Sequence, residues 1–139
     1  MIQSRSRNPE LPQVPADISV LQAAIRQFAE DRDWRKFHDP KNLAMAIAVE
    51  AGELMEHFRW LRNEQSWDAL KDAKTREEIE QEFADVMILL LEFASEATID
   101  VRAAVERKMM INAARYPVEK SRGSCVKHDR LLGNRLSEG

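Results

Sequence analysis

Apolar residues recur at three- and four-residue intervals along most of this 139-residue chain, which is the spacing of one face of an amphipathic helix. The first run follows Asp17 or Ser19, either of which can cap a helix that ends near residues 33–34. Further helices are predicted over 40–61, 76–97 and 101–115, the last of them stopped by a proline, and residues 63–75 form a spacer with room for a short extra helix. The pattern predicts an all-α, four-helix-bundle-type fold.

The two ends of the chain lack this periodicity. Residues 1–16 contain three prolines among small and polar residues, which disfavours helix and predicts a flexible arm. Residues 118–139 are polar and basic, with little to bury, and we expect a disordered tail there. One helical domain is therefore predicted over residues 17–117.

The amino-acid composition is typical of a helical protein, and it excludes some classes of partner. Hydrophobic residues make up 44% of the chain and charged residues 32%, with only four glycines. A formal net charge of −3 provides no basic field, so we do not expect a nucleic acid polymer as partner. No apolar run approaches the roughly 18 residues of a membrane span and the start does not resemble a signal peptide, so we expect a cytoplasmic protein with no membrane partner.

Two pairs of acids interrupt the apolar stripes of the second and third predicted helices. Glu50 and Glu53 form the first pair, and Glu82 and Asp85 form the second. Acids three residues apart lie on one side of a helix, and Glu50 falls inside the stripe, three residues after Ile47. Carboxylates that converge between packed helices repel one another and lose hydration, and a bound divalent cation offsets both effects. Ligand sets made only of oxygen suit Mg²⁺ or Mn²⁺.

The alternative for each pair is a solvated helix face. Four other acids on the predicted helices are interpreted as ordinary surface charge: Glu56, Glu78, Glu80 and Glu96.

Two further groups of side chains suit a nucleotide. Cations and an amide on the predicted last helix can offset phosphate charge, and rings near the second helix offer surface on which a base can stack. A hard cation also lowers the pKa of a coordinated water, which makes a nucleophile available near neutral pH. The phosphate candidates are Lys108, Asn112 and Arg115, and the aromatic candidates are Trp34, Phe37, His38 and Trp60.

These motifs together resemble the MazG-like all-α nucleoside triphosphate pyrophosphatases. The likeness covers residues 18–118 and includes the two acid pairs and the ending Lys108-x-x-x-Asn112-x-x-Arg115-Tyr-Pro. The segment from residue 32 to residue 43 is similar to the dCTP pyrophosphatase branch. Leu89 departs from that branch, where a tyrosine is expected, so the preferred base and sugar stay open.

The resemblance implies Mg²⁺-dependent hydrolysis of a (deoxy)nucleoside triphosphate, dCTP or a modified pyrimidine nucleotide, to its monophosphate and pyrophosphate by water attack at the α-phosphorus. It implies a dimer or tetramer whose sites use more than one chain. By position, the ligands of the metal are Glu50, Glu53, Glu82 and Asp85, the phosphate or sugar contacts are Lys108, Asn112 and Arg115, and the base-pocket residues are Trp34, His38 and Trp60. A phosphoribosyl-ATP pyrophosphatase and a non-catalytic helical interaction module remain as alternatives.

Overall fold

The structure, a computed structural model, describes residues 17–127 and 129, and none of these residues lies in a β-strand. The prediction of an all-α protein is therefore confirmed for the described residues. The described chain forms two compact units, one through Ile99 and one from Asp100 onward. The helices of the first unit are α1 (Ile18–Glu30), the 3₁₀ turn η1 (Arg35–Phe37), α2 (Pro40–Glu56), α3 (Asn63–Ala69) and α4 (Ala73–Glu96).

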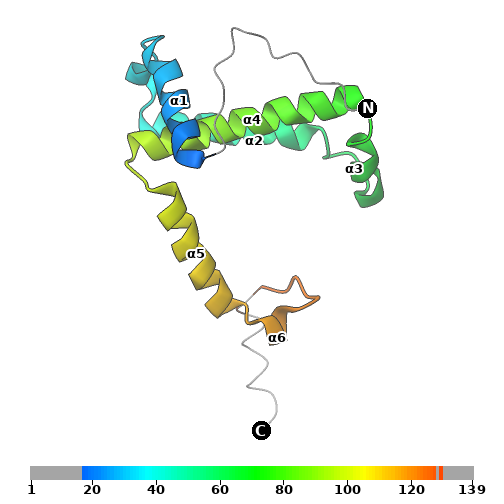
Figure 1. Ribbon diagram of the computed structural model, residues 1–139. Coiled ribbons are helices and arrows are strands. Elements are labelled where there is room, and N and C mark those ends of the chain that lie inside the picture. The colour runs from blue at the N-terminus through cyan, green and yellow to red at the C-terminus, as the bar shows by residue number, and fades with distance from the viewer. Residues whose placement is uncertain (1–16, 128, 130–139) are drawn as a thin grey trace, which may run out of the picture. The chain divides into compact units, whose positions relative to one another are not determined.

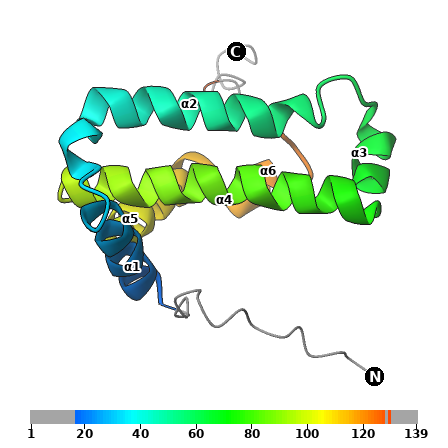
Figure 2. The ribbon, with the colours of Figure 1, turned by 90° about the horizontal axis from the view of Figure 1, so that it is seen from above.

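Helices α2 and α4 form an antiparallel hairpin that is closed at one end by α3 (Figure 2). Pro40 occupies the first turn of α2, where its missing N–H is not needed, and Asp39 caps the helix by accepting from the backbone N–H of Asn42 at 3.0 Å. Asp72 caps α4 in the same way through Thr75. The two caps fix where each arm of the hairpin begins.

Helix α1 lies across the C-terminal part of α4 (Figure 1). The side-chain amide of Gln22 donates to Ser95 Oγ at 3.0 Å and to the carbonyl of Leu91 at 3.5 Å, which fixes the crossing point. The buried apolar residues among those described come from α1, α2 and α4, and they are Ala29, Leu43, Ile79, Leu91 and Ala94. The fully buried core of the described residues is therefore small.

Three helix boundaries differ from the predicted ones. Helix α1 ends at Glu30, ahead of the predicted end near residues 33–34, and residues 31–33 form a turn. Helix α2 ends at Glu56, and the chain continues as a turn in which the N–H groups of Phe58 and Arg59 both donate to the carbonyl of Met55. The apolar spacing through Phe58 and Leu61 therefore belongs to a turn and not to the helix predicted over 40–61. Helix α4 begins at Ala73, ahead of the predicted residue 76, because Asp72 supplies a cap.

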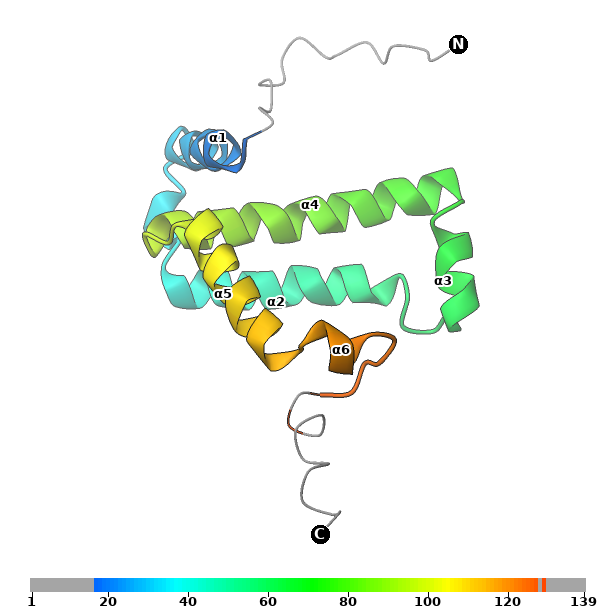
Figure 3. The ribbon, with the colours of Figure 1, turned by 60° about the horizontal axis from the view of Figure 1, so that its bottom comes forward.

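The second unit contains α5 (Val101–Arg115) and the short α6 (Val118–Ser121), joined at Tyr116 and Pro117 (Figure 3). No residue of α5 is buried, so the stripe predicted to face inward is exposed at Val105 and Met109. Helix α6 gives regular structure to the first residues of the predicted tail.

Several other predictions concern residues that the structure does not describe, or residues that it divides between the two units. Residues 1–16, the predicted arm, and the end of the predicted tail at 128 and 130–139 lie outside the described residues. A single domain over 17–117 stays a prediction, since its last helix belongs to the second unit. None of the helices described is long and apolar enough to cross a membrane.

Candidate metal centre

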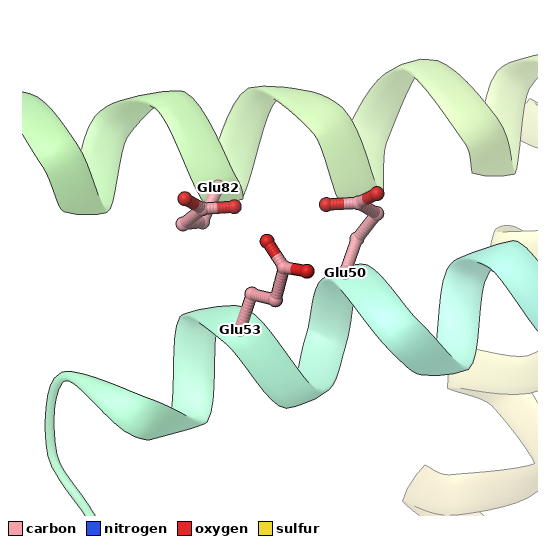
Figure 4. Close-up of side chains that lie close together, drawn as sticks. All are labelled: Glu50, Glu53 and Glu82. Atoms are coloured by element: carbon pink, nitrogen blue, oxygen red, sulfur yellow. The ribbon is translucent and has the colours of Figure 1, made fainter.

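Three of the four predicted ligands converge in the gap between the hairpin helices. Glu50 and Glu53 extend from α2 toward α4, and Glu82 extends from α4 toward them (Figure 4). Each contributes one carboxylate oxygen, and these three oxygens lie within 4.8 Å of one another. An octahedral Mg²⁺ with bonds of about 2.1 Å holds its ligand oxygens roughly 3–4 Å apart. A small rotation of the side chains is therefore enough to close the cluster around a cation.

The electrostatics of the cluster also fit a cation. Burial raises the pKa of Glu50, and the negative charges of Glu53, Asp85 and Glu82 raise it further. Asp85, the fourth predicted ligand, thus acts on the cluster through its charge, although it is not one of the three residues whose oxygens converge. A hard divalent cation that accepts only oxygen ligands would relieve this repulsion, so the residues present fit Mg²⁺ or Mn²⁺.

The centre is more open than the sequence suggests. Glu50 and Glu82 are half-buried, whereas Glu53 and Asp85 are exposed. The expectation that all four carboxylates point into a helical core is therefore wrong for the single chain, in which two of them are exposed. Exposed carboxylates are accessible to the phosphates that Mg²⁺ bridges in nucleotide sites.

His38 and Trp34 lie in the segment that joins α1 to α2. The His38 side chain is 17% exposed, and its Nδ1 lies 3.6 Å from Oε2 of Glu92 on α4. Trp34 is 46% exposed and packs edge-on against Phe28, with the ring centroids 5.9 Å apart. The guanidinium of Arg32 lies over the Phe28 ring, so a cation–π contact supports this aromatic corner.

Trp60 is not brought to the other aromatic candidates within one chain. His38 directly precedes α2 and Trp60 follows it, and a helix of 17 residues is about 25 Å long. Trp60 is 81% exposed, with the guanidinium of Arg59 over its ring. One chain therefore does not assemble the predicted base pocket from His38 and Trp60.

The predicted phosphate contacts share one face of α5. Lys108, Asn112 and Arg115 follow one another at intervals of four and three residues, and all three are exposed. They belong to the second compact unit, whereas the acids belong to the first. Their role at the metal centre stays a prediction.

Two acids near the end of α4 differ from their sequence interpretation. Glu96, interpreted as surface charge, is paired with Arg35, from Nε to Oε1 at 2.7 Å and from Nη2 to Oε2 at 3.3 Å, and this contact lowers the pKa of Glu96. Glu92 was missed, although it is buried. The signal that singles out Glu50 applies to it equally, because Glu92 lies in the apolar stripe, three residues after Leu89.

Comparison with known proteins relates this geometry to a family. The family model described as "MazG-like family" matches residues 45–131. The chain is similar to "dCTP pyrophosphatase 1" of Rattus norvegicus, with 40% identity over 122 residues that cover 88% of this chain and 70% of the rat protein. Identity to the Homo sapiens protein of the same name is 37% over the same shares of the two chains.

A solved structure gives the same indication. The crystal structure of a pyrophosphatase from Archaeoglobus fulgidus superposes with a TM-score of 0.68 and 38% sequence identity, covering 78% of this chain and 99% of the archaeal chain. The acid pairs on α2 and α4 lie within the residues that the family model matches. The chain belongs to the MazG-like family.

Proposed function

We propose that this protein is a Mg²⁺-dependent nucleoside triphosphate pyrophosphohydrolase whose substrate is dCTP or a modified pyrimidine deoxynucleotide. The observation that carries the proposal is the convergence of Glu50, Glu53 and Glu82 oxygens across the α2–α4 gap, in a chain 40% identical to a dCTP pyrophosphatase. The products are the nucleoside monophosphate and pyrophosphate.

The acids of the hairpin hold the metal. Glu50, Glu53 and Glu82 supply the converging oxygens, and Asp85 adds a fourth negative charge. When bound, the divalent cation supplies a hydroxide nucleophile near neutral pH and neutralises phosphate charge. Mn²⁺ fits the same ligands.

The remaining candidates bind the nucleotide itself. Lys108 and Arg115 offset phosphate charge, Arg115 with a guanidinium fork that matches two phosphate oxygens, and Asn112 binds phosphate or sugar. Trp34, His38 and Trp60 contact the base. The water oxygen bonds to the α-phosphorus while the bond from that phosphorus to the bridging oxygen breaks, and pyrophosphate leaves.

A second copy of the chain completes the site. The segment around His38 and the turn at Trp60 lie at opposite ends of α2, so one base reaches both only if one of them comes from a partner chain. Exposed large apolar side chains on α2 and α4 support self-association, and they include Met45, Val49, Phe83 and Leu90.

A substrate screen in ¹⁸O-labelled water tests the proposal. We expect pyrophosphate release from dCTP with Mg²⁺, no release with a chelator present, and the label in the monophosphate alone. Label in the pyrophosphate would show attack at the β-phosphorus. The panel includes modified pyrimidine nucleotides and phosphoribosyl-ATP, which separates the related pyrophosphatase activity from this one.

Variants make the screen specific to the hairpin acids. Glu53→Gln removes a ligand charge, whereas Glu78→Gln removes a half-exposed charge on α4 that is 3.8 Å from Lys74. The first variant should be inactive and the second should match the wild type. If no triphosphate is hydrolysed by the wild type and calorimetry detects no Mg²⁺-dependent nucleotide binding, the chain is a helical interaction module.

A further inference from the structure

Glu92 is a buried acid that the proposed reaction does not use. Only 3% of its surface is exposed, and no donor among the described residues forms a hydrogen bond with its Oε2. A buried carboxylate without a donor is strongly disfavoured, because it loses hydration and gains nothing in return. An acid kept in such a position needs a partner close by.

The nearest unpaired donor is the imidazole of His38. Its Nδ1 is also buried and also lacks a hydrogen-bond partner, and it lies 3.6 Å from Oε2 of Glu92. This distance is a few tenths of an ångström longer than a hydrogen bond, so a small shift satisfies both atoms with one proton. Each atom is thus the other's candidate partner.

The other charges around the pair are already engaged. Arg35, on the same segment as His38, contacts Glu96 at 2.7 Å and Glu30 at 3.1 Å. These contacts fix η1 against α1 and α4, and they leave His38 as the group facing Glu92. Burial raises the pKa of Glu92, and the neighbouring His38 and Arg35 oppose that rise only in part.

The segment that carries His38 is held by its backbone as well. The side-chain amide of Asn42 donates to the carbonyl of Phe37 at 3.2 Å, and the N–H of Trp34 donates to the carbonyl of Ala29 at 3.0 Å. These hydrogen bonds fix the backbone at both ends of η1. The His38 ring can still rotate about its side-chain bonds.

Glu92 also lies on the same face of α4 as Asp85 of the metal centre. It follows Asp85 by seven residues, two turns along one face of α4, which is a rise of about 10 Å. A nucleotide with its phosphates at the acids would reach Glu92 and His38 if its sugar and base extended along this face. His38 stands at the start of α2, beside the same stretch of α4.

We propose that Glu92 is a positioning residue, which holds the His38 ring with Nδ1 toward α4 and so determines what Nε2 offers to the nucleotide base. The inference rests on the proposed function for the identity of the ligand, but not for the pairing itself. With one proton on Nδ1, Nε2 presents a lone pair, which accepts from an exocyclic amino group such as that of cytosine. When the His38 ring carries protons on both nitrogens, its Nε2–H becomes a hydrogen-bond donor to the base instead.

The first test determines the tautomer of the His38 ring directly. Long-range ¹H–¹⁵N spectra of the full-length protein distinguish the two tautomers of His38, with His57 as an internal reference. We expect the Nδ1–H form in the wild type near neutral pH and a shift toward the Nε2–H form in Glu92→Gln, which has the same shape without the charge. A wild-type ring in the Nε2–H form would overturn the inference without recourse to any variant.

The second test separates positioning from stability. Glu92→Gln should raise KM for dCTP about tenfold, the effect of losing one charge-assisted hydrogen bond. Because the chemistry lies at the acids, kcat should stay within about twofold. Combining Glu92→Gln with His38→Gln should raise KM no further than His38→Gln alone, since Glu92 acts on the base only through His38.

The control is Glu78→Gln, a half-exposed position on the same helix, which should leave KM and the ring spectrum unchanged. Unaltered KM in a folded Glu92→Gln protein would overturn the inference. If the wild type hydrolyses no nucleotide, the proposed function fails, whereas the ring spectrum still decides whether Glu92 holds His38.

Discussion

Glu50 and Glu92 both sit in apolar stripes, and their surroundings assign them different roles. Glu50 is half-buried among three other acids, which disfavour its negative charge, so a bound cation would stabilise it. Glu92 is almost fully buried and faces an imidazole, so its partner is part of the chain. The neighbours of an inward acid thus decide whether it binds a ligand or positions another side chain.

Removing one carboxylate from the metal centre should separate activity from stability. Glu53→Gln should lower activity by more than about 100-fold, beyond the loss typical of groups that only support a ligand. The metal-free protein should melt about 1–2 °C higher, because Glu50 and Glu82 lose a like-charged neighbour. Activity assays and thermal melts in a chelator measure the two effects. A lower melting temperature would contradict this account of the repulsion.

The raised pKa of Glu50 predicts how stability changes with pH. In the unfolded chain Glu50 returns toward 4.5, so between that value and its folded pKa the folded state binds more protons. Stability from this group is complete below the unfolded pKa and is lost as pH rises through the folded pKa. Subtracting denaturation data for Glu50→Gln from those for the wild type, without metal, should show this fall. Saturating Mg²⁺ should abolish or reverse it, since the cation binds the deprotonated form.

At the scale of the helices, apolar periodicity predicted which elements exist better than where they end. The spacing through Phe58 and Leu61 is as regular as within α2, yet Glu56 is the last helical residue. A turn can present apolar side chains at helical intervals, so periodicity alone does not distinguish it from another helical turn. Asp72 had the residue type of a cap, and weighing it as one would have placed the start of α4 correctly.

At the metal centre as well, the sequence pattern predicts which residues face inward but not which residues contact one another. The acids were predictable because residues on α2 and α4 share the stripes that face each other. Glu92 carries the same stripe signal as Glu50, but only the fold reveals His38, from a segment 54 residues earlier, as its neighbour. Arg35 and Glu96 pair over a similar separation in sequence, which no local pattern reports.

The cap of α4 should contribute to stability in a pH-dependent way. Asp72 Oδ1 accepts from the backbone N–H and the hydroxyl of Thr75, both at 2.8 Å, and these bonds lower its pKa from 3.8. Its stabilisation is therefore present above pH 3.8 and is lost as pH falls through the lower, folded value. Asp72→Ala should reduce the melting temperature at neutral pH, and the difference from the wild type should shrink in acid.

Asp68→Ala is the matched control for the cap. Asp68 is an exposed aspartate at the end of α3 whose carboxylate contacts Lys71 at 2.7 Å and caps no helix. Its loss should change the melting temperature far less than the loss of Asp72, because exposed ion pairs contribute little. Equal effects in the two variants would mean that the cap does not stabilise α4.

At the scale of the whole molecule, the length of α2 separates the two halves of the proposed base pocket. His38 precedes a helix about 25 Å long and Trp60 follows it. If the proposed base pocket uses both residues, it takes them from different chains, and we expect the active species to be at least a dimer. Sedimentation should accordingly give a multiple of the 16.1 kDa chain mass.

Mixing two defective variants tests the shared pocket directly. His38→Ala and Trp60→Ala should each be nearly inactive toward dCTP, because every site in either homodimer lacks one base contact. After subunit exchange, half of the dimers are mixed, and each mixed dimer has one site with both residues intact, so about a quarter of wild-type activity should return. Ala23→Glu, an exposed change on α1, serves as the neutral partner in control mixtures. If both residues instead act within one chain, mixing restores nothing, and the proposed arrangement of the two copies is wrong.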